Sequence, residues 1–297
     1  MNQEVLSVFV LWSIYLLFAL GMNLVWGSIG ILNFAHGGIF TFSAFLAHEV
    51  LAHVRLSIFV MVPMCVVIGA ALSVAIQVLI FEPILKRAGS VAAAELQIIV
   101  AGIAVAWLLA AIMQKVIKGY PFGLSTGGAF TIQTYTFGGV RISNIQLLVI
   151  FTGLVVGIAT ASWMRVSKAG LALRAVGVDA ETASMMGINR TRLAIGTMAI
   201  AGALAGLAGA LLTYDLSAIG QETGDSLLIK AFAAIVLGGL GSVYGVAAGT
   251  FMLAFAETVV LTHTAGRWVD AISFGLIFLV LILRPQGIFG RTEVRRT

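Results

Sequence analysis

Residues 5–26 read VLSVFVLWSIYLLFALGMNLVW, residues 27–38 read GSIGILNFAHGG, and together these two stretches decide the fold. The first stretch carries no charged side chain, and about 20 apolar residues in a helix are enough to cross roughly 30 Å of hydrocarbon. No Lys or Arg precedes it, and no small-residue cleavage site follows it. We therefore expect a first membrane-spanning helix rather than a cleaved signal peptide.

The composition extends this expectation to the whole chain. Of its 297 residues, 60% are hydrophobic and only 10% are charged, and the mean hydropathy is +1.09. Soluble domains carry about 25% charged residues, so the outer surface of this protein must face lipid. We expect a single transmembrane domain over residues 1–297 and no binding of nucleic acid. Cys65 is the only cysteine, which excludes a disulfide or a thiolate metal cluster within one chain.

Further apolar segments follow along the sequence. Those long enough to span are Val5–Trp26, Phe34–His53, Ile58–Phe81, Ala92–Met113, Ile145–Met164, Leu193–Thr213 and Trp268–Leu283. Between Leu228 and Thr262 a longer apolar stretch is interrupted by glycines at 238–245, which predicts a hairpin of two short helices. The pattern predicts an all-α polytopic integral membrane protein with about nine membrane segments.

The positive charges predict the orientation. They concentrate in the loop at 165–192, in the loop Glu82–Ser90 and in the tail after Arg284, and loops rich in Lys and Arg stay in the cytoplasm. The N-terminus and the loop at 115–143 are then outside, although Lys115, Lys118 and Arg141 weaken that assignment. The loops at 215–225 and 263–267 are also placed outside. Alternation over residues 130–137, followed by two glycines, predicts a small hairpin-like cap on the outer face.

The polar residues in the second stretch allow two interpretations. Four glycines, Asn33 and His36 lie where two apolar segments meet. They fit an ordinary tight turn with a helix N-cap at Asn33. They equally fit a broken helix that lines a substrate path, because backbone freed from a helix in a membrane needs partners in protein or in a water-lined cavity.

A second glycine cluster, at 238–245, lies in the C-terminal half. Glycine-interrupted apolar segments in corresponding positions of two halves are typical of transporters. The similarity of residues 37–42 to residues 248–253 is a weak sign of an internal repeat. It agrees with two pseudo-symmetric halves.

Glycines also recur at four-residue spacing, as in Gly153/Gly157, Gly202/Gly206 and Gly241/Gly245/Gly249. Small residues at this spacing let helix backbones approach closely. We expect these glycines to serve helix packing rather than substrate contact.

The charged loop at 165–192 holds a short amphipathic segment from Asp179 to Met186. Asp179 and Glu181 suit the positive end of a helix dipole, and Gly187 is a plausible helix stop. Ala180, Ala183 and the pair Met185–Met186 could form an apolar patch. Such a helix either docks on a partner, lies on the lipid surface, or contacts nothing.

Residues with catalytic chemistry are sparse. Glu257 lies in an apolar run, where a carboxyl is costly; it is either an ion or proton site or a group hydrogen-bonded to a neighbouring helix. His36 is more typical of a packing or turn residue than of a ligand. The sequence shows no metal-ligand spacing and no catalytic grouping. It also lacks a Gly-x-x-x-x-Gly-Lys-Ser/Thr phosphate loop, so we expect no ATP hydrolysis by this chain.

Three segments together resemble one family. They are Asn33–Gly37, the loop 170–189 ending in Met186-Gly187-Ile188-Asn189, and the run from Lys230 to Ser242. In order and spacing they are similar to the LivH-type permeases of branched-chain amino acid ABC importers, and the likeness extends from about residue 11 to residue 289. The ending RPQGIFG at 284–290 is also similar.

The resemblance implies a transport subunit, not an enzyme, in the inner membrane of a bacterium. It implies a second homologous permease, two cytoplasmic ATPase subunits that use ATP and magnesium, and an external substrate-binding protein as partners. No cofactor is implied for this chain itself. Members carry branched-chain amino acids, and others carry urea, amides or aromatic acids.

The resemblance also assigns residues. Those near the translocation path are Asn33, Phe34, His36, Gly37, Gly38, Gly239, Gly241 and Ser242. Those that would rest on an ATPase are Ala180, Ala183, Met186, Gly187 and Asn189. From the residues alone, a stand-alone channel or secondary transporter using Glu257 and His36, a membrane-embedded enzyme and a purely structural subunit stay open.

Overall fold

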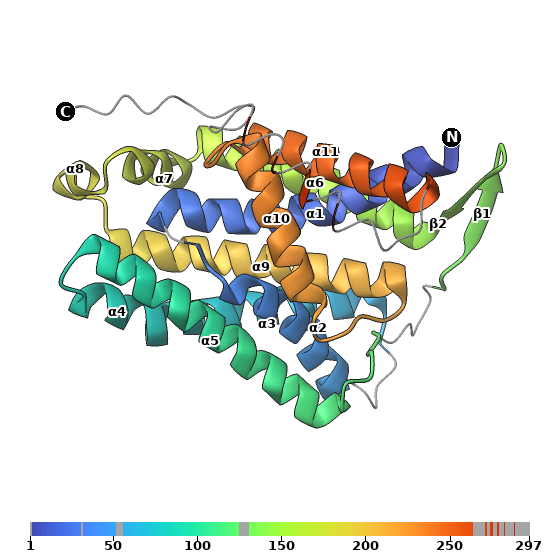
Figure 1. The fold of residues 1–297 in the computed structure, drawn as a ribbon, viewed down its shortest axis with the longest axis horizontal. Coiled ribbons are helices and arrows are strands. Elements are labelled where there is room, and N and C mark those ends of the chain that lie inside the picture. Colours follow the sequence, from blue (N-terminus) through green and yellow to red (C-terminus); the bar gives the residue numbers. More distant parts are fainter. Residues whose placement is uncertain are drawn as a thin grey trace.

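The computed structural model describes residues 2–30, 32–51, 56–124 and 131–263, and isolated positions between 271 and 288. Figure 1 shows the helices and strands of these ranges. The helices are α1 (Asn2–Ile29), α2 (Ala35–Leu51), α3 (Ile58–Ile76), the π-helical turn η1 (Gln77–Phe81), α4 (Glu82–Arg87), α5 (Val91–Ile117), α6 (Asn144–Val166), α7 (Lys168–Val178), α8 (Ala180–Met185), α9 (Arg190–Leu216), α10 (Thr223–Gly238) and α11 (Val243–His263). The strands are β1 (Thr134–Phe137) and β2 (Val140–Ser143).

The expected helical membrane protein is confirmed, but the count of about nine segments is not. Among the described residues, six helices are long and apolar enough to cross a membrane: Gln3–Gly27, Ile58–Arg87, Ala92–Ile117, Asn144–Val166, Arg190–Leu216 and Val243–His263. The expected span at 34–53 is α2, which has only 17 residues. The expected hairpin of two short helices consists of α10 with 16 residues and α11 with 21. The expected span Trp268–Leu283 lies outside the described residues, apart from isolated positions.

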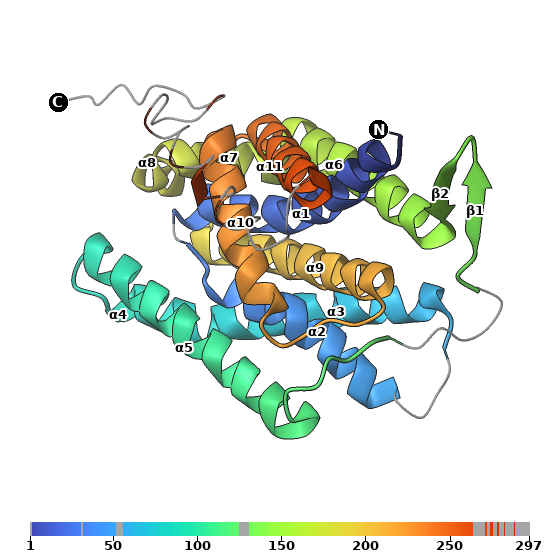
Figure 2. The ribbon, with the colours of Figure 1, turned by 45° about the vertical axis from the view of Figure 1, so that its right-hand side comes forward.

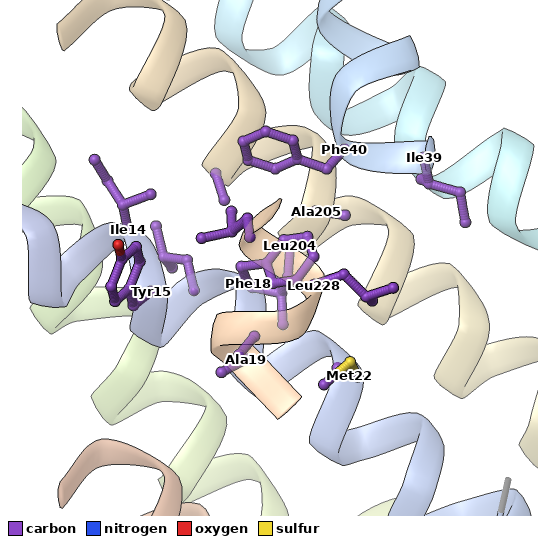
Figure 3. Close-up of a cluster of buried hydrophobic side chains, with 14 of the residues drawn as sticks. Ile14, Tyr15, Phe18, Ala19, Met22, Ile39, Phe40, Leu204, Ala205 and Leu228 are labelled. Atoms are coloured by element: carbon purple, nitrogen blue, oxygen red, sulfur yellow. The ribbon is translucent and has the colours of Figure 1, made fainter. Parts of the chain in front are cut away.

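Helices α1 and α9 form the centre of the bundle and contact the helices around them (Figures 1 and 2). Their side chains meet in a dry core, part of which Figure 3 shows around Phe18, Phe40 and Leu204. On the outside, Trp107 of α5, Phe59 of α3 and Phe151 of α6 are each about two-thirds exposed or more. Such apolar groups on the periphery belong against lipid tails rather than water.

The glycines at four-residue spacing lie at helix contacts, as predicted, except Gly241, which lies in a turn and has nothing within 4 Å of an added Cβ. A Cβ on Gly153 of α6 would lie 2.5 Å from Cβ of Ser13 on α1. A Cβ on Gly206 of α9 would meet the carbonyl of Cys65 on α3, and one on Gly249 of α11 would meet the carbonyl of Ala234 on α10. Each of these glycines therefore sets the distance between two helices.

The bundle has two different ends (Figure 1). We call one the hairpin end, because the start of α1 lies there beside strands β1 and β2, which pair antiparallel as the sequence predicts. Gly138 and Gly139 have φ of 57° and 82°, which is the geometry of a two-residue hairpin turn that glycines favour. The opposite end carries α4, α7 and α8 with the positive loops, and we call it the charged end.

Candidate functional site

The first interruption of the apolar chain lies between α1 and α2. Gly30 has a φ of 74°, which glycine adopts without strain. The N–H of Ala35 donates to Oδ1 of Asn33 over 3.0 Å, and the N–H of His36 donates to the carbonyl of Asn33 over 3.1 Å. Asn33 therefore caps α2, as the first of the two interpretations of this stretch expects.

This interruption lies level with the middle of the long helices. A Cβ on Gly102, near the middle of α5, would lie 3.2 Å from the nitrogen of Phe34. A Cβ on Gly21 of α1 would lie 3.0 Å from both the His36 ring and the carbonyl of Ala201, near the middle of α9. The start of α2 is thus buried inside the bundle rather than placed at a membrane surface.

His36 is a packing residue in this structure. Its side chain is fully buried, its ring centroid lies 4.6 Å from that of Phe18, and its Nε2 lies 3.2 Å from the Phe18 carbonyl. This geometry holds the first turn of α2 against α1.

Helix α10 begins at the same place as α2. A Cβ on Gly37 would lie 2.5 Å from the carbonyl oxygen of Gly224, and a Cβ on Gly224 would meet the carbonyl of Gly37 and the hydroxyl of Thr41. The two backbones are therefore in direct contact, and neither glycine can bear a side chain without a shift. We call this contact the α2–α10 crossing.

The chain enters the crossing from the hairpin end. After α9, residues Phe122 and Ile219 exchange two backbone hydrogen bonds of 3.0 and 2.9 Å, and the Phe122 ring lies 5.7 Å from that of Phe45 on α2. Ile219 therefore lies near the level of Phe45, which is eight residues beyond Gly37 along α2. Because eight helical residues span about 12 Å, the chain between Ile219 and Gly224 returns inward by about that distance. The expected external loop at 215–225 therefore ends inside the bundle.

Gly224 is a residue that the sequence analysis missed. The polar residues around Gly224 are typical of a loop. The one signal of a close contact in the sequence is that glycine has no side chain. From the crossing, α2 leads to the hairpin end, and α10 crosses the long helices steeply on its way to the charged end (Figures 1 and 2).

The second glycine cluster forms the turn between α10 and α11. Gly239 and Gly241 have φ of 103° and 77°, and Ser242 Oγ accepts a 3.0 Å hydrogen bond from the N–H of Gly245. The N–H of Gly241 donates to Oδ1 of Asn23 on α1 over 3.0 Å. Asn23, a buried amide within an apolar run, also went unnoticed in the sequence.

This turn lies at the charged end. The guanidinium of Arg165, in the last turn of α6, lies 4.5 Å from the ring centroid of Tyr244. Because α10 has 16 residues, about 24 Å of helix separates the turn from the α2–α10 crossing. The structure therefore does not bring Gly239, Gly241 and Ser242 together with Asn33, Phe34, His36, Gly37 and Gly38.

Glu257 is paired inside the bundle. Its side chain is almost fully buried, with Oε1 3.0 Å from Nζ of Lys230 on α10. Tyr15 on α1 donates its hydroxyl proton to Oε2 over 2.5 Å. Of the two interpretations of Glu257, the structure shows the carboxyl bound to neighbouring helices.

The segment expected to dock on a partner forms helices α7 and α8. Asp179 caps α8, since its Oδ1 accepts from the N–H groups of Glu181 and Thr182 at 3.0 Å each. The Thr182 hydroxyl donates to its Oδ2 over 2.6 Å. The bond from this hydroxyl, followed by the backbone bonds, lowers the pKa of Asp179 below its usual value. Gly187 ends the helix with a φ of 87°.

The apolar surface of α8 differs from the expected patch. Met185 and Met186 are more than 80% exposed, but Ala183 is only 4% exposed. The N–H of Ile188 donates to the carbonyl of Ala183, so this part of α8 faces inward. Asn189 caps α9 by accepting from the N–H of Arg192 over 3.0 Å. Met185, the last residue of α8, and Met186, which follows it, are therefore the large apolar side chains exposed at this helix.

Within the described ranges, no group of three or more His, Cys, Asp or Glu side chains is placed to hold a metal ion. What the described residues form is a multi-pass helical bundle with two interrupted helices inside it and a short capped helix outside it. This is the architecture of a membrane transport subunit.

The chain belongs to the family of permease components of branched-chain amino acid transport systems, whose family model matches residues 5–281. It is thus a permease component and not an enzyme. It is 30% identical to the high-affinity branched-chain amino acid transport system permease protein BraD of Pseudomonas aeruginosa, over 99% of this chain and 97% of the relative. It is 28% identical to the corresponding LivH protein of Escherichia coli K12, with the same coverage. A probable LivH protein of Methanocaldococcus jannaschii is 26% identical over 94% of this chain and 89% of its own length. No solved structure matches the chain.

Proposed function

We propose that this chain is one of two membrane-spanning subunits of a binding-protein-dependent importer for branched-chain amino acids. ATP hydrolysis in separate subunits would drive alternating access. The supporting observation is that relatives named as branched-chain amino acid permeases align with it from end to end. The partners are a second homologous permease, two ATPase subunits that bind ATP and magnesium, and an external binding protein.

The translocation path follows the α2–α10 crossing. Residues Asn33, Phe34, His36, Gly37 and Gly38 bring an interrupted backbone to the middle of the bundle, where membrane proteins place irregular backbone next to a pathway. Helix α10 continues the path toward the charged end, where Gly239, Gly241 and Ser242 form its inner limit. In this proposal the two glycine-interrupted regions, at 27–38 and at 238–245, are corresponding positions of two related halves, in keeping with the similarity of residues 37–42 in α2 to residues 248–253 in α11.

The charged end faces the cytoplasm of a bacterial inner membrane, and the N-terminus lies outside. The support is that the loops 82–90 and 165–192, both rich in Lys and Arg, lie at one end of the bundle. There Met186, with Ala180, Gly187 and Asn189 around it, docks on an ATPase subunit. Ala183 contributes by holding α8 in place.

A gentle detergent pull-down of this chain from its native membrane, followed by mass spectrometry, tests the assembly. We expect a second permease and two ATPases to co-purify. The binding protein encoded nearby is then titrated with leucine, isoleucine and valine. It is also titrated with urea and aromatic amino acids, which represent the alternative substrate classes. Recovery of this chain alone would contradict the importer, and tight binding of urea would contradict the substrate class.

A further inference from the structure

One buried ion pair lies in the middle of α10, away from both glycine contacts of that helix. Lys230 on α10 and Glu257 on α11 are joined at 3.0 Å, with side chains 20% and 3% exposed. The Tyr15 hydroxyl on α1 donates to the second carboxylate oxygen over 2.5 Å. We call these three residues the Lys230 cluster; it joins α1, α10 and α11.

The surroundings of the cluster are apolar. Leu228 and Ala231 on α10 and Ala254 on α11 are all buried in the same core as Tyr15. Taking two charges out of water is costly, and replacing a buried ion pair by well-packed apolar side chains often leaves a protein equally stable. A buried pair is better understood through the register it imposes, because only one alignment of the helices brings both charges together.

Helix α10 needs such a constraint. Its two ends are held by backbone contacts, at Gly37–Gly224 and at Gly238–Gly245, which fix distance but present no side chains to interlock. One face is open, since Ile229 and Phe232 are 48% and 38% exposed. Between these ends Leu227, Leu228 and Ile235 pack into the apolar core. Apolar packing is not directional, whereas a short ion pair is satisfied in one alignment of the helices only.

We propose that Lys230, Glu257 and Tyr15 are positioning residues for transport, which fix the register of α10 against α11 and α1 and keep its N-terminus at the α2–α10 crossing. The assignment rests on the proposed function, because the crossing matters only if the path runs through it. The cluster acts through the position of α10 and does not itself contact substrate.

The test compares the wild-type complex with the double variant Lys230→Met/Glu257→Gln. Both charges of the ion pair are removed together, and the glutamine can still accept from Tyr15. Each complex is purified with its partners, matched for assembled amount, and analysed by amide hydrogen exchange and by uptake of radiolabelled leucine into proteoliposomes.

We expect amides of residues 223–238 in the double variant to exchange about tenfold faster than in wild type, with residues 144–166 unchanged, since local opening free energies differ between elements. Leucine uptake should fall about fivefold or more, because residues in direct contact are energetically coupled and α10 would lose its register at the crossing. Lys86→Met is the matched control. It removes an exposed lysine whose partner Glu82 lies 3.2 Å away within α4, and both readouts should stay at the wild-type level.

Unchanged exchange in α10 of the double variant would overturn the assignment. So would faster exchange with normal leucine uptake, because the register would then be irrelevant to transport. A wild-type complex that takes up no leucine would contradict the proposed function instead, and the exchange of α10 would still decide whether the cluster fixes its register.

Discussion

Gly37 and Gly224 allow the backbones of α2 and α10 to touch inside the bundle, because neither residue has a side chain. Each residue puts its α-carbon against the other's carbonyl, so the two short helices start from one point. The neighbouring Gly38 is less constrained, because a Cβ added there would lie 3.2 Å from the Cα of Ala106 and from the Cδ1 of Leu109.

The first prediction is that Gly37→Ala destabilises the chain and abolishes uptake. The new methyl group would meet the carbonyl of Gly224 at 2.5 Å, and overpacking of this kind costs about 1–3 kcal/mol. Thermal unfolding in detergent and uptake in membrane vesicles measure the two effects.

Gly27→Ala is the matched control for that prediction. It lies before the same interruption, its φ is not in the left-handed region, and nothing lies within 4 Å of an added Cβ. A Gly37→Ala variant as stable and active as the Gly27→Ala variant would contradict the close contact at the crossing.

Asp179 allows a prediction about pH at the same scale. Its pKa is lowered in the folded chain, mainly by the Thr182 hydroxyl. The stabilisation is therefore present above the ordinary aspartate pKa of about 3.9 and is lost as the pH falls through the lower folded value. The N-cap of α8 should therefore stay intact from neutral pH down past the ordinary aspartate pKa and fail only as the pH falls through the lower pKa of folded Asp179.

A carbon NMR titration of labelled Asp179 in nanodiscs checks this, with Thr182→Val as the comparison. The variant lacks the hydroxyl, so its Asp179 should titrate at a higher pH than in wild type. Identical midpoints in the two proteins would show that the hydroxyl does not hold the carboxylate.

At the scale of elements, α8 is a six-residue helix with a defined start and stop and two exposed methionines. Flexible, polarisable methionine side chains suit a surface that must adapt to a partner. Charge at Ala183 is a poor probe of docking because that residue is buried, and a substitution of Gly187 strains the left-handed turn. Met186 tests the contact without either effect.

We therefore predict that Met186→Glu leaves the complex assembled but lowers ATP-driven uptake about tenfold or more, while ATP hydrolysis continues. Burying an unpaired carboxylate in an apolar contact costs more than burying a neutral polar group. Uptake and phosphate release are measured on the same vesicles. Glu181→Gln, an exposed change in the same helix, should behave as wild type, and normal uptake by Met186→Glu would remove the coupling role from α8.

The elements also show which features the sequence can predict. The spans, the Asn33 cap, the β-hairpin and the start of α8 at Asp179 follow from local patterns of apolarity and capping. The re-entry of the chain at Gly224 and the bond from Gly241 to Asn23 do not, because they depend on which helices become neighbours. Likewise Ala183 turns inward only because α8 packs back on α7.

For the molecule as a whole, the two ends of the bundle and the two short helices between them suit a protein that opens to one side at a time. ATP can shift the equilibrium between the two open states only if the ATPase subunits contact these states differently. If α8 docks on an ATPase and the path runs through the crossing, as we propose, the two regions must be mechanically linked. In the proposed importer, helix α10, which runs from the crossing to the charged end, would provide that link.

The most direct test is leucine uptake by proteoliposomes that contain the purified complex with its binding protein outside and ATP inside. We predict uptake that requires both ATP and the binding protein and that stops when ATP is replaced by a non-hydrolysable analogue. Equal uptake without ATP would contradict the account and identify this chain as a channel or secondary transporter.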